Sequence, residues 1–312
     1  MLIDILLFVI SIPILIYSSE FFTDNASKLA KSIGVSEFII GITVVGIGTS
    51  LPEIMVTDYA SFTGESGIVL GNIIGSNITN IALILGVAFF IRNTVISDSH
   101  IVKDSIVHLI VLMLGTIIFL SGNNISRLEG VIMIAVYVLY ILYSLKSHKR
   151  PDEKTPHDNF VLKRIFYIIV ALAGVLIGSK LLVDSAVNIA NMLGISSAVI
   201  AITVIAFGTS LPELAVSISA AKRGFTMLIL GNIVGSNVTN MMLAMGTASI
   251  IREVVIEDVH FIQFSLVFML LLSIILIAAM KKKNLSRIWG VMYLLFYAVF
   301  IWLSYTGLIS GL

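Results

Sequence analysis

The sequence of 312 residues contains no cysteine, so a disulfide framework and a thiolate metal site are both excluded. Charged residues are also few, at 12% of the chain against about 25% in soluble domains. The net charge of +1 offers no basic surface to a nucleic acid. Hydrophobic residues are abundant instead, at 58%, with a mean hydropathy of +1.08. Such a chain cannot cover itself with a water-facing surface and is therefore predicted to be an all-α integral membrane protein.

Apolar runs separated by polar clusters predict ten transmembrane helices, near 2–22, 36–60, 67–91, 101–120, 127–146, 161–183, 196–220, 227–251, 260–280 and 287–308. A span needs about 20 residues, and it must be helical because lipid offers no partner to backbone N–H and C=O groups. The main polar stretch, 147–160, is predicted to be a linker between a first unit, 1–146, and a second unit, 161–312.

Lysine and arginine are distributed unequally between the two sides of these predicted spans. Of the 19 basic residues, all but Arg127, Lys180 and Arg252 fall in loops on one side. Because basic loops stay in the cytoplasm, the linker is predicted to be cytoplasmic and both termini extracellular. The chain would then be a multi-pass protein of the cell membrane.

The two units repeat one another at a constant offset of 160 residues. The segment GTSLPE at 48–53 returns at 208–213, and GNIIGSNITN at 71–80 returns as GNIVGSNVTN at 231–240. Each unit has five predicted spans, an odd number, so the second unit must be inverted relative to the first. Inverted repeats with an ion site at the midplane are a transporter architecture.

Prolines are scarce, and two of the five, Pro52 and Pro212, fall at matching mid-membrane positions. Proline removes a backbone donor and clashes with the carbonyl four residues earlier, so both helices are predicted to break near the midplane. A purely structural kink is the alternative, but a carboxylate, Glu53 or Glu213, directly follows each proline. A carboxylate at this depth costs about 2.5–3.5 kcal/mol on insertion scales and should face a cavity or a cation. Protonated glutamic acids that serve packing are the other interpretation.

The next helix of each unit carries a polar stripe. Ser76 and Asn80 lie four residues apart and share a face, and Ser236 and Asn240 repeat this spacing. Such groups can also bridge helices without any ligand, an alternative that is strongest for Asn72, Asn77, Asn232 and Asn237. The donors are carboxylate, hydroxyl, amide and carbonyl oxygens, which suit hard cations such as Na⁺ and Ca²⁺ rather than Zn²⁺ or Cu⁺.

These paired segments resemble the alpha-repeats of the sodium/calcium exchanger family, within the cation/calcium antiporters, and the resemblance covers essentially the whole chain. It implies adjacent ion sites at the membrane centre and alternating access by sliding of the first and sixth helices. The ion ligands that the resemblance implies are the side chains of Glu53, Glu213, Thr49, Ser50, Thr209, Ser210, Ser76, Ser236, Asn80 and Asn240, with the carbonyls of Gly46 and Ala206. Some relatives, including potassium-dependent ones, have aspartate where this chain has Asn80 or Asn240, so potassium co-transport is disfavoured.

The function implied by the resemblance is secondary antiport of sodium against calcium, electrogenic and without a cofactor. Proton/calcium antiport through the same glutamates is the alternative. A cation channel is disfavoured because channels are normally built by oligomeric symmetry around a pore, and an enzyme is disfavoured because no catalytic dyad motif is present. The expected partners are sodium and calcium ions and the lipid bilayer. No obligate protein partner is indicated, and the sequence is compatible with a monomer.

Overall fold

The computed structural model of the chain describes residues 2–95, 100–147, 161–192, 206–256, 258–282 and 284–305. The elements of the first half are α1 (Leu2–Ile33), α2 (Glu37–Ile40), the π-helical segment η1 (Gly41–Val45), α3 (Gly46–Thr49), α4 (Leu51–Thr63), α5 (Ser66–Ile78), the π-helical segment η2 (Thr79–Ile84), α6 (Leu85–Ile91), β1 (Thr94–Val95), α7 (His100–Leu120), β2 (Asn124–Ile125) and α8 (Arg127–Ser147). The elements of the second half are α9 (Val161–Met192), α11 (Ala206–Gly208), α12 (Leu211–Arg223), α13 (Thr226–Val238), the π-helical segment η4 (Thr239–Ala244), α14 (Met245–Ile251), β3 (Val254–Val255), α15 (Val259–Lys281), β4 (Asn284–Leu285) and α16 (Arg287–Tyr305).

Among the described residues, eight helices are long and apolar enough to cross a membrane. The bent pair Glu37–Thr49 and Leu51–Thr63 makes a ninth if it is one span. The predominantly helical membrane protein expected from the composition is therefore what the structure contains. Two other predictions, the span at 196–220 and most of the linker at 147–160, fall partly or wholly on residues 193–205 and 148–160, outside the described part of the chain.

The helices α1 and α9 are longer than hydropathy predicted. α1 continues to Ile33 and α9 to Met192, and each has 32 residues. At 1.5 Å per residue such a helix is about 48 Å long, more than the ~30 Å of a hydrocarbon core. The predicted end of α1 at residue 22 was wrong because the residues that follow it are polar yet buried, among them Thr23, Asn25 and Ser27. They pack against protein, so their polarity does not mark the end of the helix.

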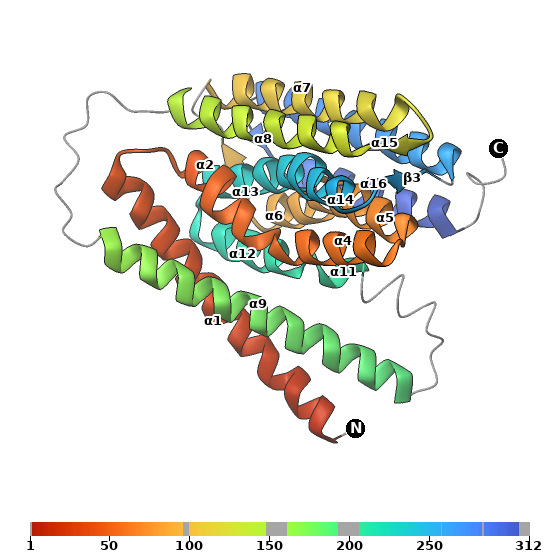
Figure 1. The fold of residues 1–312 in the computed structure, drawn as a ribbon. Helices are drawn as coiled ribbons and strands as arrows, with labels where there is room; N and C mark the ends of the chain where they lie inside the picture. The colour runs from red at the N-terminus through yellow and green to blue at the C-terminus, as the bar shows by residue number, and fades with distance from the viewer. Residues whose placement is uncertain are drawn as a thin grey trace.

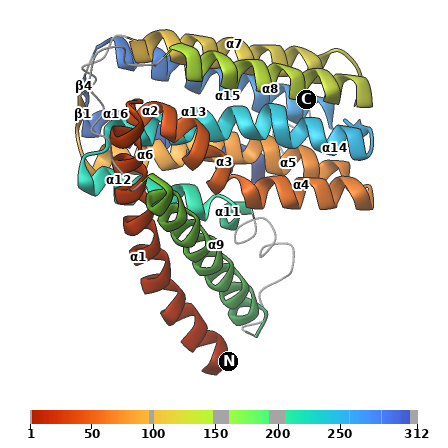
Figure 2. The same ribbon diagram turned by 60° about the vertical axis from the view of Figure 1, so that its left-hand side comes forward.

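The helices form a central body with a helix pair on each flank (Figure 1). α1 and α9 cross one another on one flank and extend away from the body, as the second view also shows (Figure 2). α7 and α8 run side by side along the opposite flank. The body between them contains the broken helices α3, α4, α11 and α12, and the polar-stripe helices α5 and α13. Glu53 on α4 and Glu213 on α12 are both fully buried in this body.

Two short antiparallel ladders connect the halves. β1 pairs with β4, with Thr94 opposite Leu285, and β2 pairs with β3, with Asn124 opposite Val255. Adding the offset of 160 residues to β1 gives β3, and adding it to β2 gives β4. Exchanging the two halves therefore converts one ladder into the other.

Close backbone contact joins α13 to the broken helix of the first half. A Cβ atom added to Gly41 would lie 2.7 Å from Gly231 Cα, and one added to Gly46 would lie 3.0 Å from the carbonyl carbon of Gly235. Gly231 and Gly235, four residues apart on α13, face this segment, and only glycine permits so close an approach. For the matching Gly71 and Gly75, no described atom lies within 4 Å of an added Cβ.

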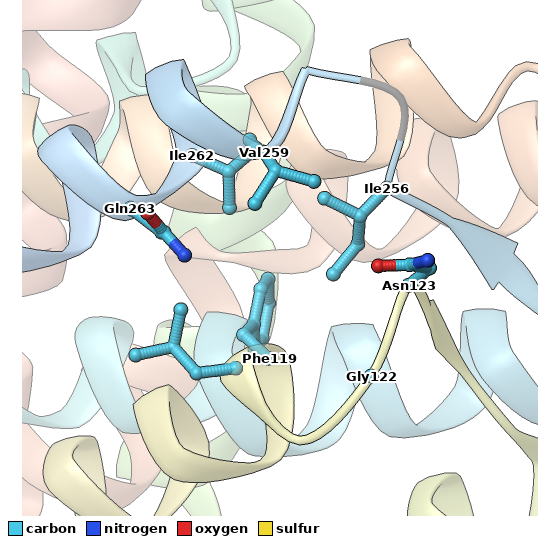
Figure 3. Close-up of a pocket in the computed structure, with 8 residues that line it drawn as sticks. Phe119, Gly122, Asn123, Ile256, Val259, Ile262 and Gln263 are labelled. Atoms are coloured by element: carbon cyan, nitrogen blue, oxygen red, sulfur yellow. The ribbon is translucent and has the colours of Figure 1, made fainter.

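A cavity of about 140 Å³ lies near the β2–β3 ladder, where α7 ends and α15 begins (Figure 3). It is lined by Phe119, Leu120, Gly122, Asn123, Ile256, Val259, Ile262 and Gln263. A second cavity, of about 150 Å³, lies between α1 and α12. Neither cavity is lined by Glu53 or Glu213.

Candidate cation site

The helix breaks occur at a serine, two residues before each proline. Ser50 has φ −81° and ψ 5°, and Ser210 has φ −87° and ψ 8°, so neither residue continues an α-helix. Pro52 and Pro212 then lie in the first turn of α4 and α12, where a missing N–H leaves no hydrogen bond unmade. In the first half the axis bends by 45° at this point. The predicted break is confirmed there, and it takes the form of a bend rather than a long unwound segment.

Each break places a glutamate beside the serine of the other half. Ser210 Oγ donates to Glu53 Oε1 over 3.0 Å, and Ser50 Oγ donates to Glu213 Oε1, also over 3.0 Å. Both glutamates are 0% exposed. The second carboxylate oxygen, Oε2, has no hydrogen-bond partner among the described residues in either glutamate. The structure thus brings the two carboxylates into one cross-linked cluster and leaves one oxygen of each available.

The threonine before each break also contacts the opposite half. Thr49 Oγ1 donates to Asn232 Oδ1 over 3.2 Å, and Thr209 Oγ1 donates to Asn72 Oδ1 over 3.4 Å. Asn72 and Asn232 were not among the residues assigned to the site from sequence. Their position on the polar stripe was the available signal, but a stripe does not show which neighbour its members contact.

The polar stripes of α5 and α13 run into π-helical turns that begin at Thr79 and Thr239. These turns present Asn80 and Asn240, which are both fully buried. Short π-helical insertions in α-helices are frequent at functional sites, because the extra residue re-aims side chains and carbonyls. Asn80 Nδ2 donates to Asn237 Oδ1 over 3.0 Å, whereas neither amide atom of Asn240 has a partner in the part of the chain that the structure describes.

Ser236 is the stripe residue that contacts the broken helix directly. Its hydroxyl lies 3.3 Å from Gly46 O and 3.4 Å from Glu213 Oε1. The hydroxyl of the matching Ser76 is buried and has no hydrogen-bond partner within the described ranges. Ala206, whose carbonyl was predicted to match that of Gly46, is the first residue of α11 and lies at the edge of the described segment.

Unpartnered oxygens are the common feature of this region. They belong to the buried atoms Glu53 Oε2, Glu213 Oε2, Ser76 Oγ, Asn77 Oδ1, Asn80 Oδ1 and Asn240 Oδ1. In the described part of the chain no lysine or arginine is buried, so neither type of side chain shares the interior with the two carboxylates. A buried carboxylate without a counter-charge requires a cation or a proton. An all-oxygen set of this kind suits Na⁺ or Ca²⁺, and Ca²⁺ takes 6–8 oxygen ligands.

Comparison with known proteins finds matches that cover both halves of the chain. Residues 3–146 and 163–306 match the profile of a family described as "Sodium/calcium exchanger protein". An uncharacterized membrane protein of Methanocaldococcus jannaschii is 35% identical over 296 residues, which cover 94% of this chain and 95% of the relative. The sodium/calcium exchanger MaX1 of Methanosarcina acetivorans is 29% identical over 344 residues, with 96% and 97% coverage.

The fold also matches that of a solved structure. A structure of the sodium-calcium exchanger NCX_Mj, soaked with 10 mM Na⁺ and zero Ca²⁺, superimposes with a TM-score of 0.88. Its sequence is 33% identical, and the match covers 96% of this chain and 98% of that one. The similarity therefore includes the flanking helices as well as the central segments.

Proposed function

The chain belongs to the sodium/calcium exchanger protein family, a family of cation/calcium antiporters, and on this basis we propose that it exchanges Na⁺ for Ca²⁺ by alternating access. The observation that carries the proposal is the carboxylate pair. Glu53 and Glu213 are fully buried, each is hydrogen-bonded by the serine of the opposite half, and each keeps one oxygen without a partner. With no buried lysine or arginine in the described chain, the pair is suited to neutralising one Ca²⁺.

The transported ions are proposed to bind at the oxygens around this pair. The ligands are the side chains of Thr49, Ser50, Glu53, Ser76, Asn80, Thr209, Ser210, Glu213, Ser236 and Asn240, with the carbonyls of Gly46 and Ala206. Hydroxyl and amide oxygens carry no charge, so several Na⁺ ions can use the same oxygens when Ca²⁺ is absent. Overlapping sites of this kind explain why the two ions would compete and alternate.

We propose further that the architecture is ten spans arranged as two inverted repeats, 1–146 and 161–312, joined by the linker 147–160. The exchange of the two β-ladders at the offset of 160 supports this arrangement. So do the matched bonds Ser50–Glu213 and Ser210–Glu53, which are converted into one another by the same offset. The distribution of basic residues supports a cytoplasmic linker, with both termini outside the cell.

The exchange is proposed to be electrogenic. If three Na⁺ ions exchange for one Ca²⁺, as the family resemblance suggests, one net charge crosses the membrane in each cycle. The membrane potential then contributes about 2.3 kcal/mol per 100 mV to the driving force. Inward sodium flow would in this way drive calcium out of the cell.

The experiment is ⁴⁵Ca²⁺ uptake into proteoliposomes of the full chain at clamped pH, with and without a sodium gradient. Uptake that requires internal Na⁺ and ignores an imposed pH gradient is expected. Uptake that follows the pH gradient without Na⁺ would replace the proposal with proton/calcium antiport, because a carboxylate oxygen without a partner can also carry a proton. Empty liposomes and liposomes with Glu213→Gln protein are the controls.

A further inference from the structure

Two asparagines outside the predicted ligand set each contact both halves of the chain. Asn72, on α5, lies against α4 of its own half and against Thr209 of the other. Asn232, on α13, lies against Ser217 of its own half and against Thr49 of the other. The same arrangement occurs twice, at positions separated by the offset of 160, so it is not an isolated contact.

The amide groups of these asparagines have the same orientation in both halves. Asn72 Nδ2 donates to Thr57 Oγ1 over 2.8 Å and to the carbonyl oxygen of Glu53 over 3.1 Å. Asn232 Nδ2 donates to Ser217 Oγ over 3.1 Å. An amide nitrogen can only donate and an amide oxygen can only accept, so fixing the nitrogen in its own half also directs the oxygen towards the other half.

This orientation determines what the threonine hydroxyls can do. Thr49 and Thr209 face an amide oxygen, so they must act as donors in these contacts. A hydroxyl has one hydrogen and two lone pairs. When the hydrogen points to the asparagine, the lone pairs remain for a cation. Val45 O, 3.0 Å from Thr49 Oγ1, is a second acceptor for the single hydrogen of the Thr49 hydroxyl.

We infer that Asn72 and Asn232 are positioning residues that keep the hydroxyl oxygens of Thr209 and Thr49 turned towards the transported cation. The inference rests on the proposed function and adds two residues that act through the threonines rather than on the ion. Partners of metal ligands in other proteins typically contribute about 10–100-fold to metal affinity. We therefore expect Asn232→Ala to weaken Ca²⁺ binding about tenfold, as far as Thr49→Val does.

A double-mutant cycle separates this role from a general structural one. Ca²⁺ binding to the purified full chain in detergent is measured by calorimetry for Thr49→Val, Asn232→Ala and the double variant. If Asn232 acts through Thr49, the double variant binds Ca²⁺ about as weakly as Thr49→Val alone. Losses of affinity that multiply in the double variant would overturn the inference, and so would an unchanged affinity in Asn232→Ala.

The other half of the molecule provides the matched control. Asn72 contacts Thr209 and not Thr49, so the losses in Thr49→Val and Asn72→Ala are expected to multiply. Should Asn232→Ala fail to fold, Asn232→Asp keeps an acceptor oxygen opposite Thr49 and is expected to bind Ca²⁺ better than Asn232→Ser. Equal losses in these two variants would show that the acceptor is not what matters.

The measurement is independent of sodium coupling. A protein that binds Ca²⁺ but exchanges it for protons would still give an interpretable cycle. A wild-type chain that binds no Ca²⁺ would contradict the proposed function and, with it, the inference, whereas normal Ca²⁺ binding with a multiplicative cycle would contradict the inference alone.

Discussion

The centre of the molecule and the ends of its long helices differ in how far the two halves agree. At the centre, Ser50–Glu213 and Ser210–Glu53 have the same 3.0 Å length. At the ends they do not match. In the first half, α1 is tied to α12 by Arg223, which contacts Asp24 Oδ1 over 2.7 Å and Glu20 Oε2 over 3.5 Å.

The corresponding region of α9 lacks these ties. Lys180 and Asp184, at the positions that match Glu20 and Asp24, pair with each other on the same helix over 2.8 Å. Thr63, which matches Arg223, bonds only to carbonyls of its own turn in the described chain. A buried bond between Thr23 and Ser219 adds to the contact of α1 with α12.

The contrast between the centre and the long helices indicates which contacts the two halves need to share. The proposed cation ligands come from both halves, and the serine–glutamate and threonine–asparagine contacts occur in both. The contacts of Ser236 and Asn80 have no counterpart at Ser76 and Asn240 in the described chain.

The ion pairs of Arg223 with Asp24 and Glu20, called the clamp below, tie α1 to α12. If the chain alternates between two access states as proposed, the clamp is expected to favour the state in which it forms.

The largest effect is expected for the two central carboxylates, and it tests whether the two halves contribute equally to the centre. Glu53→Gln and Glu213→Gln are both expected to abolish Ca²⁺ uptake into proteoliposomes, because each removes half of the buried negative charge that neutralises the ion. Asp58→Asn is the matched control on α4, since Asp58 bonds to Thr247 over 2.7 Å and not to the carboxylate pair. Full uptake with either glutamine variant would show that the two carboxylates are not equivalent.

A smaller loss is expected when the cross-half serines are changed. Ser50→Ala and Ser210→Ala each remove one hydrogen bond to a carboxylate, a bond type that contributes about 1.5–3 kcal/mol. Half-saturation for Ca²⁺ is expected to rise about tenfold in both, and by amounts that agree within about threefold. A large loss in one variant and none in the other would break the symmetry of the centre.

Much of the centre was accessible from sequence because it is carried by repeated segments. The offset of 160 and the GTSLPE motif identified Ser50, Glu53 and their counterparts, and the structure places these segments in contact; their role as ion ligands remains a prediction. The Arg223–Asp24 pair joins residues 199 positions apart and has no counterpart in the repeat. Neither hydropathy nor spacing contains information on such a contact, so it had to come from the structure.

An intermediate effect is expected for the clamp, the ion pairs that Arg223 makes with Asp24 and Glu20. The effect should differ between the halves, because α9 has no matching pairs with α4 in the described chain. Arg223 is about a third exposed, so its ion pairs contribute about 1 kcal/mol, or about fivefold in a population. Because the chain has no cysteine, Leu214→Cys provides a single thiol on the cavity between α1 and α12. Arg223→Gln is expected to speed maleimide labelling of this thiol about fivefold.

The matched control for the clamp is Lys180→Gln, which removes the local pair of α9 and should change labelling little. Charge reversal supplies a rescue, since Arg223→Asp combined with Asp24→Arg restores an ion pair and is expected to return labelling towards the original rate. Equal acceleration of labelling by Arg223→Gln and Lys180→Gln would show that the ion pairs of α1 and α9 do not differ in their effect.

The smallest expected effect concerns the outer helix α8, where the halves differ by one hydrogen bond. The Tyr137 hydroxyl lies 3.3 Å from Thr239 Oγ1, at the start of η4, whereas the matching Tyr297 has no such bond to Thr79 in the described chain. One neutral hydrogen bond contributes about 1 kcal/mol, which corresponds to about 2 °C in melting temperature for a chain of this size. Tyr137→Phe is expected to lower the melting temperature by that amount, and Tyr297→Phe by less.

Because Asn240 directly follows Thr239, loosening η4 should also weaken Ca²⁺ binding in Tyr137→Phe more than in Tyr297→Phe. Equal changes in both variants would mean that the two halves hold their π-helical turns alike, and that the difference between them is confined to the ends of α1 and α9.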